Sequence, residues 1–404
     1  MIVSLKRKVF YLFPVLFCFC FPFGFKVLSP ILMAWLLVSF FNWDLVNIRK
    51  GLFNRNLQIL VAFFALTVLS AFLSDNHIEA GISIEIKLSF ILFPYLMFCF
   101  EWPLNILRRC LVGFVSGCFF ACLYLIARAS VFAYEGHSEY FSYTFFSDFI
   151  HASYFSMYLV LATGIILNYY RHWFYTNRQI MISSYFFISV FITTIFLCAS
   201  KMGLISLFIC VPLLLYQKWK DRFGIKRSLF ILSIGIVLVL IAGRFIPGTF
   251  DRFLAIQNIS IQNLDKTSSE SNTIRLLIWE QSVYIIKEHF WLGLGVGDAN
   301  DALYKAYQEN GLTGAMENHL NAHNQYLQTF LGIGFIGFVL LLALTLGGII
   351  KGLKKKNVML TFFSILICLN FMVESMLQAV AGTLFFAFFF CLFNLIEEKR
   401  MLSE

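Results

Sequence analysis

The chain has 404 residues, of which 60% are hydrophobic and only 13% are charged. Its mean hydropathy is +0.79, and 50 of its residues are phenylalanine. A soluble globular domain needs polar surface between its apolar runs, so this composition excludes a soluble protein and indicates an integral membrane protein. The net charge of +9 does not indicate a nucleic-acid-binding protein, because the basic residues are spread over separate segments instead of forming one stripe.

Apolar runs that are long enough to cross a bilayer recur along the whole chain. Such a run needs roughly 17–25 residues, and a backbone inside lipid must satisfy its own hydrogen bonds, which favours helices. The runs also lack the strict alternation typical of a membrane β-barrel. We therefore predict an all-α polytopic membrane protein with about 12 transmembrane helices, at about 9–25, 27–43, 57–73, 82–100, 110–127, 148–169, 180–199, 202–216, 229–246, 323–350, 357–375 and 380–396.

The distribution of lysine and arginine indicates how these spans are oriented, since cytoplasmic loops carry an excess of both. With the N-terminus placed inside, 21 of the 31 basic residues fall in the inner segments. The short outer connections carry few of the remaining ten basic residues. A polar segment at 248–322 separates the ninth span from the tenth. We expect both termini to be cytoplasmic, residues 1–404 to form a single integral membrane domain, and segment 248–322 to form one large outer loop.

This outer loop has a helical pattern of its own. Between Arg275 and Trp291 the apolar residues recur at intervals of three or four, at Leu276, Trp279, Val283, Ile286 and Phe290. The spacing predicts an amphipathic helix that lies along the membrane surface. The glycine-rich stretch 293–297 then predicts a turn and not a dinucleotide loop, because no strand precedes it. A second short helix is expected at about 299–309.

His323 stands where the outer loop meets the tenth span. A histidine at that boundary can hold or pass a proton near neutral pH; the alternative is a structural histidine that bonds a backbone carbonyl. His319 comes four residues earlier, so the two would share a face if both lay on one helix, but no glutamate of a zinc-protease motif lies between them. The ten cysteines lie in or beside apolar runs without a CxxC pair. We expect no metal site and no cofactor.

Two cations are candidates for binding phosphate at the outer face. Arg275 begins the predicted amphipathic helix, and a guanidinium can form forked hydrogen bonds to phosphate oxygens. Lys201 lies between two closely spaced apolar runs, so its ammonium must sit at or just within the outer boundary, where an ionisable group tends to face a cavity or a partner. The alternative for both residues is contact with lipid headgroups.

Three further ionisable residues are expected at the same face. Glu374, near the outer end of the eleventh span, is expected to pair with one of the cations or to belong to the site. His151 begins the sixth span, and Arg244 lies at the entrance to the large loop. For each of them, a structural role at the interface is the alternative.

Three motifs together resemble the bacterial O-antigen ligase and polymerase superfamily. The segment from Arg275 through Trp279 and His289 to Gly293-Leu294-Gly295 resembles the family's outer-loop pattern, although Phe290 follows His289 where proline is common. The segment 323–337, which opens with His-Asn-Gln-Tyr-Leu, resembles the start of the family's next span. Ser200-Lys201-x-Gly203 resembles a Ser-Arg-x-Gly step between two earlier spans, with lysine in place of the usual arginine. The resemblance is best over roughly 195–390.

The resemblance implies a glycosyltransferase of the bacterial inner membrane that needs neither a metal nor a nucleotide. Its site would face the periplasm, so the loop 248–322 would be periplasmic. The enzyme would move a glycan from undecaprenyl pyrophosphate to a hydroxyl of lipid A–core. His323 would then be the catalytic residue, and Arg275 and Lys201 would bind the donor pyrophosphate. Membrane lipids, but no nucleic acid, are expected as further partners.

Two alternatives remain open at this point. An O-antigen polymerase would use a second lipid-linked glycan as the acceptor. A flippase or transporter of lipid-linked glycans is a different class of protein, and it would distribute ionisable residues through its spans. Here the ionisable residues gather at the outer face, which favours an enzyme.

Overall fold

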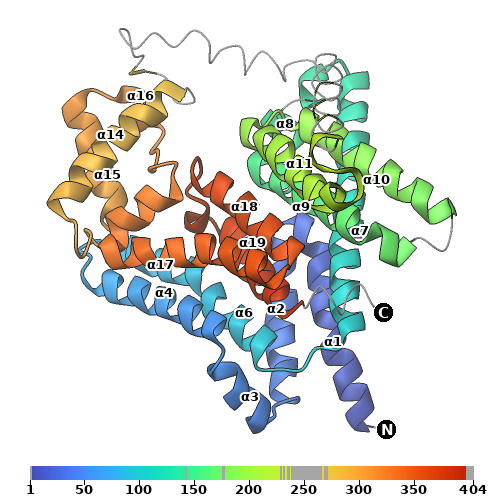
Figure 1. The fold of residues 1–404 in the computed structure, drawn as a ribbon. Coiled ribbons are helices and arrows are strands. Elements are labelled where there is room, and N and C mark those ends of the chain that lie inside the picture. The colour runs from blue at the N-terminus through green and yellow to red at the C-terminus, as the bar shows by residue number, and fades with distance from the viewer. Residues whose placement is uncertain are drawn as a thin grey trace.

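The computed structural model describes residues 2–141, 143–174, 178–227, 230, 233, 237, 266–267 and 272–396. All regular elements in these ranges are helices, as predicted (Figure 1). The α-helices are α1 Ile2–Cys20, α2 Phe25–Phe40, α3 Leu45–Leu52, α4 Arg55–Phe72, α5 His77–Lys87, α6 Ser89–Phe98, α7 Leu104–Tyr134, α8 Tyr143–Phe146, α9 Ala152–Phe174, α10 Arg178–Leu197, α11 Lys201–Phe223, α14 Asn272–Glu288, α15 Ala299–Asn310, α16 Thr313–Glu317, α17 Gln325–Lys355, α18 Val358–Phe371 and α19 Val380–Leu395. Short 3-10 helices are η1 Phe21–Phe23, η2 Ser138–Phe141 and η3 Met376–Gln378.

In the described ranges, five helical stretches are long and apolar enough to cross a membrane. They are Arg55–Phe72, His77–Phe98, Leu104–Tyr134, Ala152–Tyr169 and Gln325–Lys355. Shorter apolar helices lie at Phe25–Phe40, Ser183–Leu197, Lys201–Gln217, Val358–Phe371 and Val380–Leu395. Of the predicted span 229–246, only residues 230, 233 and 237 are described. The structure therefore supports a helical membrane protein, while the number of twelve spans stays a prediction.

Asparagine side chains begin several of these helices, because a side-chain oxygen can accept hydrogen bonds from the unpaired N–H groups of the first turn. Asn54, Asn76 and Asn357 do this for α4, α5 and α18. Asn324 accepts from Tyr326 N and Leu327 N at the start of α17. The capping residue Asn324 therefore sets the start of α17 at Gln325, two residues after His323.

The centre of the molecule is an aromatic core around α19, which Figure 1 shows in red between the other helices. This helix is apolar all round and is buried along most of its length, as expected for a helix surrounded by other helices. Phe385 stacks on Tyr158 of α9 at 4.5 Å, and Phe388 contacts Phe17 of α1 at 5.2 Å. These aromatic contacts join α19, near the end of the chain, to α1 and α9 in its first half.

A second, smaller hydrophobic cluster lies outside this core, in α14, α15 and α16. Figure 1 shows these three helices in gold and orange at one end of the molecule, beside α17. The predicted helix at 299–309 is confirmed as α15, Ala299–Asn310. The side of α14 that packs into this cluster carries Ile274 and Ile278, whereas Leu276 and Val283 of the predicted apolar face are 52% and 42% exposed. The predicted position of that face along the membrane surface stays a prediction. Apolar residues occur on both sides of α14, so periodicity alone did not identify the buried one.

The glycine-rich stretch 293–297 forms a turn that packs into a kink of α17. The kink lies at Gly334, whose φ is 75°. Leu294 N donates to Leu331 O at 2.8 Å, and Phe335 N donates to Phe290 O at 3.0 Å. The turn thereby satisfies backbone groups that the break in α17 leaves free, and it holds α14 against the N-terminal half of α17.

Replacement of Gly334 by alanine is expected to lower the free energy of unfolding by about 2–3 kcal/mol. A left-handed φ is strained for alanine, and a Cβ atom would lie 2.4 Å from Trp291 O. Thermal unfolding in detergent measures the effect. Gly347→Ala is the matched control, since it lies on the same helix with no atom within 4 Å of the added Cβ. Equal unfolding temperatures of the two variants would contradict this account of the kink.

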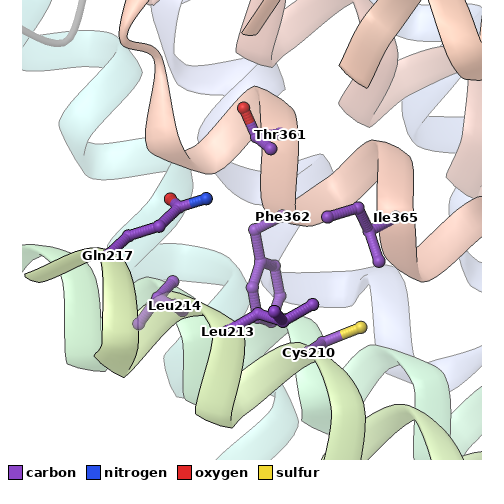
Figure 2. A pocket seen from close by; sticks show the side chains of 7 residues that line it. All are labelled: Cys210, Leu213, Leu214, Gln217, Thr361, Phe362 and Ile365. Atoms are coloured by element: carbon purple, nitrogen blue, oxygen red, sulfur yellow. The ribbon is translucent and has the colours of Figure 1, made fainter. Parts of the chain in front are cut away.

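Within the part of the chain that the structure describes, cavities lie among the spans, away from the loop helices. A small one lies between α11 and α18, where Cys210 and Leu214 face Phe362 and Ile365 (Figure 2). A larger one lies between α7, α9 and α10. Both are mostly apolar, and neither includes Arg275, His323 or Glu374 among its lining residues.

Candidate functional site

The candidate site is centred on Glu374, in the short connection between α18 and η3. Glu374 N donates to Asn370 O at 3.0 Å, so the residue continues the last turn of α18. Its side chain is only 19% exposed. A carboxylate that is removed from water to this extent needs partners that compensate its charge, and two are present.

Arg275, in the first turn of α14, supplies one of these partners. Its Nη2 lies 3.3 Å from Glu374 Oε1, and its Nη1 donates to Val373 O at 2.7 Å. The predicted pairing of Glu374 with a cation is therefore present. A guanidinium has five N–H donors, so these two contacts leave donors of Arg275 that can face a ligand.

His323 supplies the second partner, just before α17. Its Nδ1 is buried and lies 3.4 Å from Glu374 Oε2. Oε1 of Glu374 thus contacts Arg275, and Oε2 faces His323. In the tautomer whose proton sits on Nδ1 and faces the carboxylate, Nε2 of His323 is left as a hydrogen-bond and proton acceptor. This is the arrangement that general-base histidines use, with a carboxylate that orients the ring.

The charges around Glu374 keep it ionised. Burial by itself raises the pKa of this carboxyl, but the contact with His323 and the positive charge of Arg275 outweigh burial and hold the pKa below its ordinary value. Electrostatic interaction with His151 lowers the pKa of Glu374 further. Glu374 is therefore negatively charged at neutral pH, as an orienting group for His323 requires.

A set of hydrogen bonds fixes the backbone immediately before His323. Trp279 Nε1 donates to Ala322 O at 2.9 Å, and Ala322 N donates to Gln328 Oε1 at 3.0 Å. Gln328 Nε2 in turn donates to Asn300 Oδ1 of α15 at 2.9 Å. The backbone C=O and N–H of Ala322 are thus held from α14 and α17, respectively, and the next residue, His323, has a left-handed φ of 43°.

The loop that carries Glu374 is tied to the start of α17 as well. Asn324 N donates to Ser375 Oγ at 3.2 Å, and Leu377 N donates to Gln325 Oε1 at 2.6 Å. Sequence reasoning did not identify Ser375, Gln325 or Gln328 as members of the site. The available signal was the presence of two amide side chains, three residues apart, in the first turns of a long apolar helix.

The remaining predicted site residues are His151, Lys201 and Arg244. His151 directly precedes α9 and lies within electrostatic range of the carboxylate. Lys201 is the first residue of α11, and this helix end lies against α9, since a Cβ on Gly203 would be 2.4 Å from Ser156 Cβ. Arg244 lies outside the described residues. The structure therefore joins Arg275, Glu374 and His323 by direct contacts, with His151 nearby.

His319 does not share a helix with His323. It follows α16 in a turn with a φ of 48°, its ring contacts that of Tyr304 at 5.2 Å, and its carbonyl accepts from Tyr304 Oη at 3.1 Å. These contacts give His319 a packing role in the loop. In the part of the chain that the structure describes, no group of three or more His, Cys, Asp or Glu side chains is arranged to hold a metal ion.

The sequence of this chain is similar to sequences of known proteins. The model of the O-antigen ligase family matches residues 185–342, an interval that contains Lys201, Arg275 and His323. An uncharacterized protein of Haemophilus influenzae is 24% identical over 189 residues, which cover 46% of this chain and 47% of that protein. The aligned region thus spans about half the length of this relative. The family match supports membership of this chain in the O-antigen ligase and polymerase superfamily, as its motifs predicted.

Proposed function

We propose that this protein is an O-antigen ligase-like glycosyltransferase that moves a glycan from undecaprenyl pyrophosphate to a hydroxyl of lipid A–core. The observation that carries the proposal is the bridging of Arg275 and His323 by Glu374. These contacts bring a histidine and a guanidinium to one carboxylate, and in the proposal the histidine would accept a proton and the guanidinium would bind an anion. Two of the three residues fall inside the family match.

His323 would act on the acceptor. The acceptor hydroxyl attacks the anomeric carbon of the donor glycan, a new glycosidic bond forms, and the bond from that carbon to the pyrophosphate oxygen breaks. The hydroxyl proton passes to Nε2 of His323, and Glu374 stabilises the imidazolium that results. The products are the glycosylated acceptor and undecaprenyl pyrophosphate.

Arg275 would act on the donor. Negative charge grows on the pyrophosphate as it departs, and N–H donors already fixed in place stabilise such charge without reorganisation. The hydrogen bonds to Val373 O and Glu374 hold the guanidinium in place. Lys201 would add a second cation as a point charge, without the fork of an arginine. In this proposal the charge is stabilised by side chains, with neither a metal nor a nucleotide required.

The same proposal places the protein in the bacterial inner membrane with its site toward the periplasm. The excess of lysine and arginine in the inner segments supports this orientation. Residues 272–322, whose helices carry Arg275 and lead into His323, are then part of the periplasmic loop. The lipid-linked donor and the lipid A–core acceptor would both reach the site from the outer leaflet.

Product analysis tests the proposal. Purified protein supplied with lipid-linked glycan and lipid A–core is expected to form the conjugate without added metal or nucleotide. Lengthening of the lipid-linked glycan would instead show the polymerase, and movement of the glycan lipid across vesicles without a new glycosidic bond would show the transporter. In a deletion strain, loss of all O-chain from core indicates a ligase, whereas a single repeat on core indicates a polymerase.

Replacement of Trp279 by phenylalanine tests how His323 is positioned. The change keeps an aromatic ring but removes the Nε1–H that holds Ala322 O. Glycan transfer is expected to fall by roughly tenfold, because small misplacements of a catalytic group are costly. Trp291→Phe is the control, since Trp291 is 68% exposed. Equal activity of both variants would remove Trp279 from the positioning network.

A further inference from the structure

The larger cavity is a groove between α7, α9 and α10. Its floor consists of the buried side chains Val115, Ile165, Ile166 and Ser184, and it opens to the outside beside Val112, which is 40% exposed. The groove contains about 620 Å³ of empty space, open solvent included. An apolar groove of this kind suits a hydrocarbon chain and not a water-soluble ligand.

The groove is separate from the Glu374 cluster. His151 precedes α9 at the cluster, whereas Ile165 lies in the later part of the same helix. At about 1.5 Å per residue, the 13 residues from Ala152 to Ile165 span about 20 Å. The lining residues on α9 therefore lie about 20 Å along the helix from the end that carries His151.

An aromatic pair lies toward one end of the groove and basic residues lie toward the other. The ring of Phe187, which lines the groove on α10, stacks at 3.9 Å on Phe119, which lies one turn past the lining residue Ser116 on α7. One turn before Val112, at the N-terminal end of α7, lie the half-buried Arg108 and the exposed Arg109. Residues three and four apart share a helix face, so both arginines lie on the side of α7 that lines the groove. About 15 Å of helix separates Arg109 from Phe119.

We propose that this groove binds an acyl chain of an anionic phospholipid whose phosphate contacts Arg108 and Arg109. The apolar floor would accommodate the chain, the stacked phenylalanines would limit its depth, and the two guanidiniums would select a negatively charged headgroup. In the predicted topology this end of α7 is cytoplasmic, so the lipid comes from the inner leaflet. The bound lipid would hold α10 against α7 and α9, at the beginning of the segment that matches the family.

Native mass spectrometry of the purified full-length chain, titrated with phosphatidylglycerol or phosphatidylcholine, tests this site. The first phosphatidylglycerol is expected to bind at least five-fold more tightly than the first phosphatidylcholine. Arg109→Gln should reduce the affinity for phosphatidylglycerol by about five-fold, which corresponds to about 1 kcal/mol for one basic residue at a lipid surface. Arg55→Gln is the matched control, because Arg55 is an exposed arginine that begins a different span, α4.

A second pair of variants tests the groove itself. Ser116→Phe places a ring among the lining residues and should abolish the tightest binding of phosphatidylglycerol. Leu123→Phe, at a 41% exposed position of the same helix, should leave it unchanged. If Ser116→Phe does not fold, Val112→Trp at the rim provides the same test.

Equal binding of both lipids by the wild type would overturn the proposal. Unchanged binding in Arg109→Gln or in the groove-filling variant would do the same. Displacement of phosphatidylglycerol by undecaprenyl phosphate, with no effect of Arg109→Gln, would show that the groove holds a polyprenyl chain instead. None of these readouts depends on glycan transfer, so the site and the proposed function can fail separately.

Discussion

Replacement of His323 by alanine is expected to lower the rate of glycan transfer by about 10²–10⁴-fold, the usual contribution of a positioned proton acceptor. Nδ1 of His323 faces Glu374 at 3.4 Å, so alanine removes the proposed acceptor of the hydroxyl proton and leaves Glu374 Oε2 without this partner. The rate of conjugate formation from lipid-linked glycan and lipid A–core measures the effect. Binding of the donor is expected to change little, since Arg275 remains.

His319→Ala is the matched control for this variant. His319 also has a left-handed φ and lies only four residues earlier, but its ring packs on Tyr304. The control is expected to keep most of the activity, and both variants should elute as folded protein in gel filtration. Full activity of His323→Ala would remove His323 from the mechanism.

Replacement of Glu374 by glutamine is the second large effect that the geometry predicts. An amide cannot serve as the negative partner of both Arg275 and His323, and it does not hold the imidazole in the tautomer that leaves Nε2 free. The rate of transfer is expected to fall by about 10²-fold or more. The free energy of unfolding is expected to fall by about 1–3 kcal/mol, because two polar partners lose a buried acceptor.

The same variant should change the response to acid. The pKa of Glu374 is held below its ordinary value in the folded protein, so this carboxylate stabilises the fold above that ordinary value, and the contribution is lost as the pH falls through the lowered pKa. Wild-type protein is therefore expected to lose stability between about pH 5 and the lowered pKa. Glu374→Gln should lack this part of the acid dependence.

Glu317→Gln is a suitable control, since Glu317 is an exposed carboxylate at the end of α16. It should leave the activity, the stability and the acid dependence unchanged. If Glu374→Gln behaved like Glu317→Gln in all three measurements, the bridge between Arg275 and His323 would have no role in transfer.

The residues of the candidate site could be predicted from the sequence because polar residues are rare in this chain. In an apolar sequence, an ionisable side chain at a membrane boundary is costly and needs a reason to be there, which drew attention to Arg275, His323 and Glu374. The glycine-rich turn at 293–297 was predictable for a local reason, since glycine alone adopts the backbone angles found there without strain. The short helix α15 was also predicted, at about 299–309.

Other features could not be predicted, because they depend on which surfaces meet. The buried side of α14 is the one with Ile274 and Ile278, and the sequence offered an equally apolar alternative around Leu276. The hydrogen bonds of Gln328 and Trp279 to Ala322 cross between helices that are distant in sequence. The lipid groove arises between α7, α9 and α10, and no motif marks it.

The sequence by itself determined the helical membrane class and which polar residues are available, because bilayer thickness and the cost of unpaired backbone groups limit what an apolar chain can form. Only the tertiary structure decided that one carboxylate, Glu374, contacts both Arg275 and His323. Those contacts need atoms placed within about 3–4 Å by three separate helices and loops, and such distances follow from packing and not from local pattern.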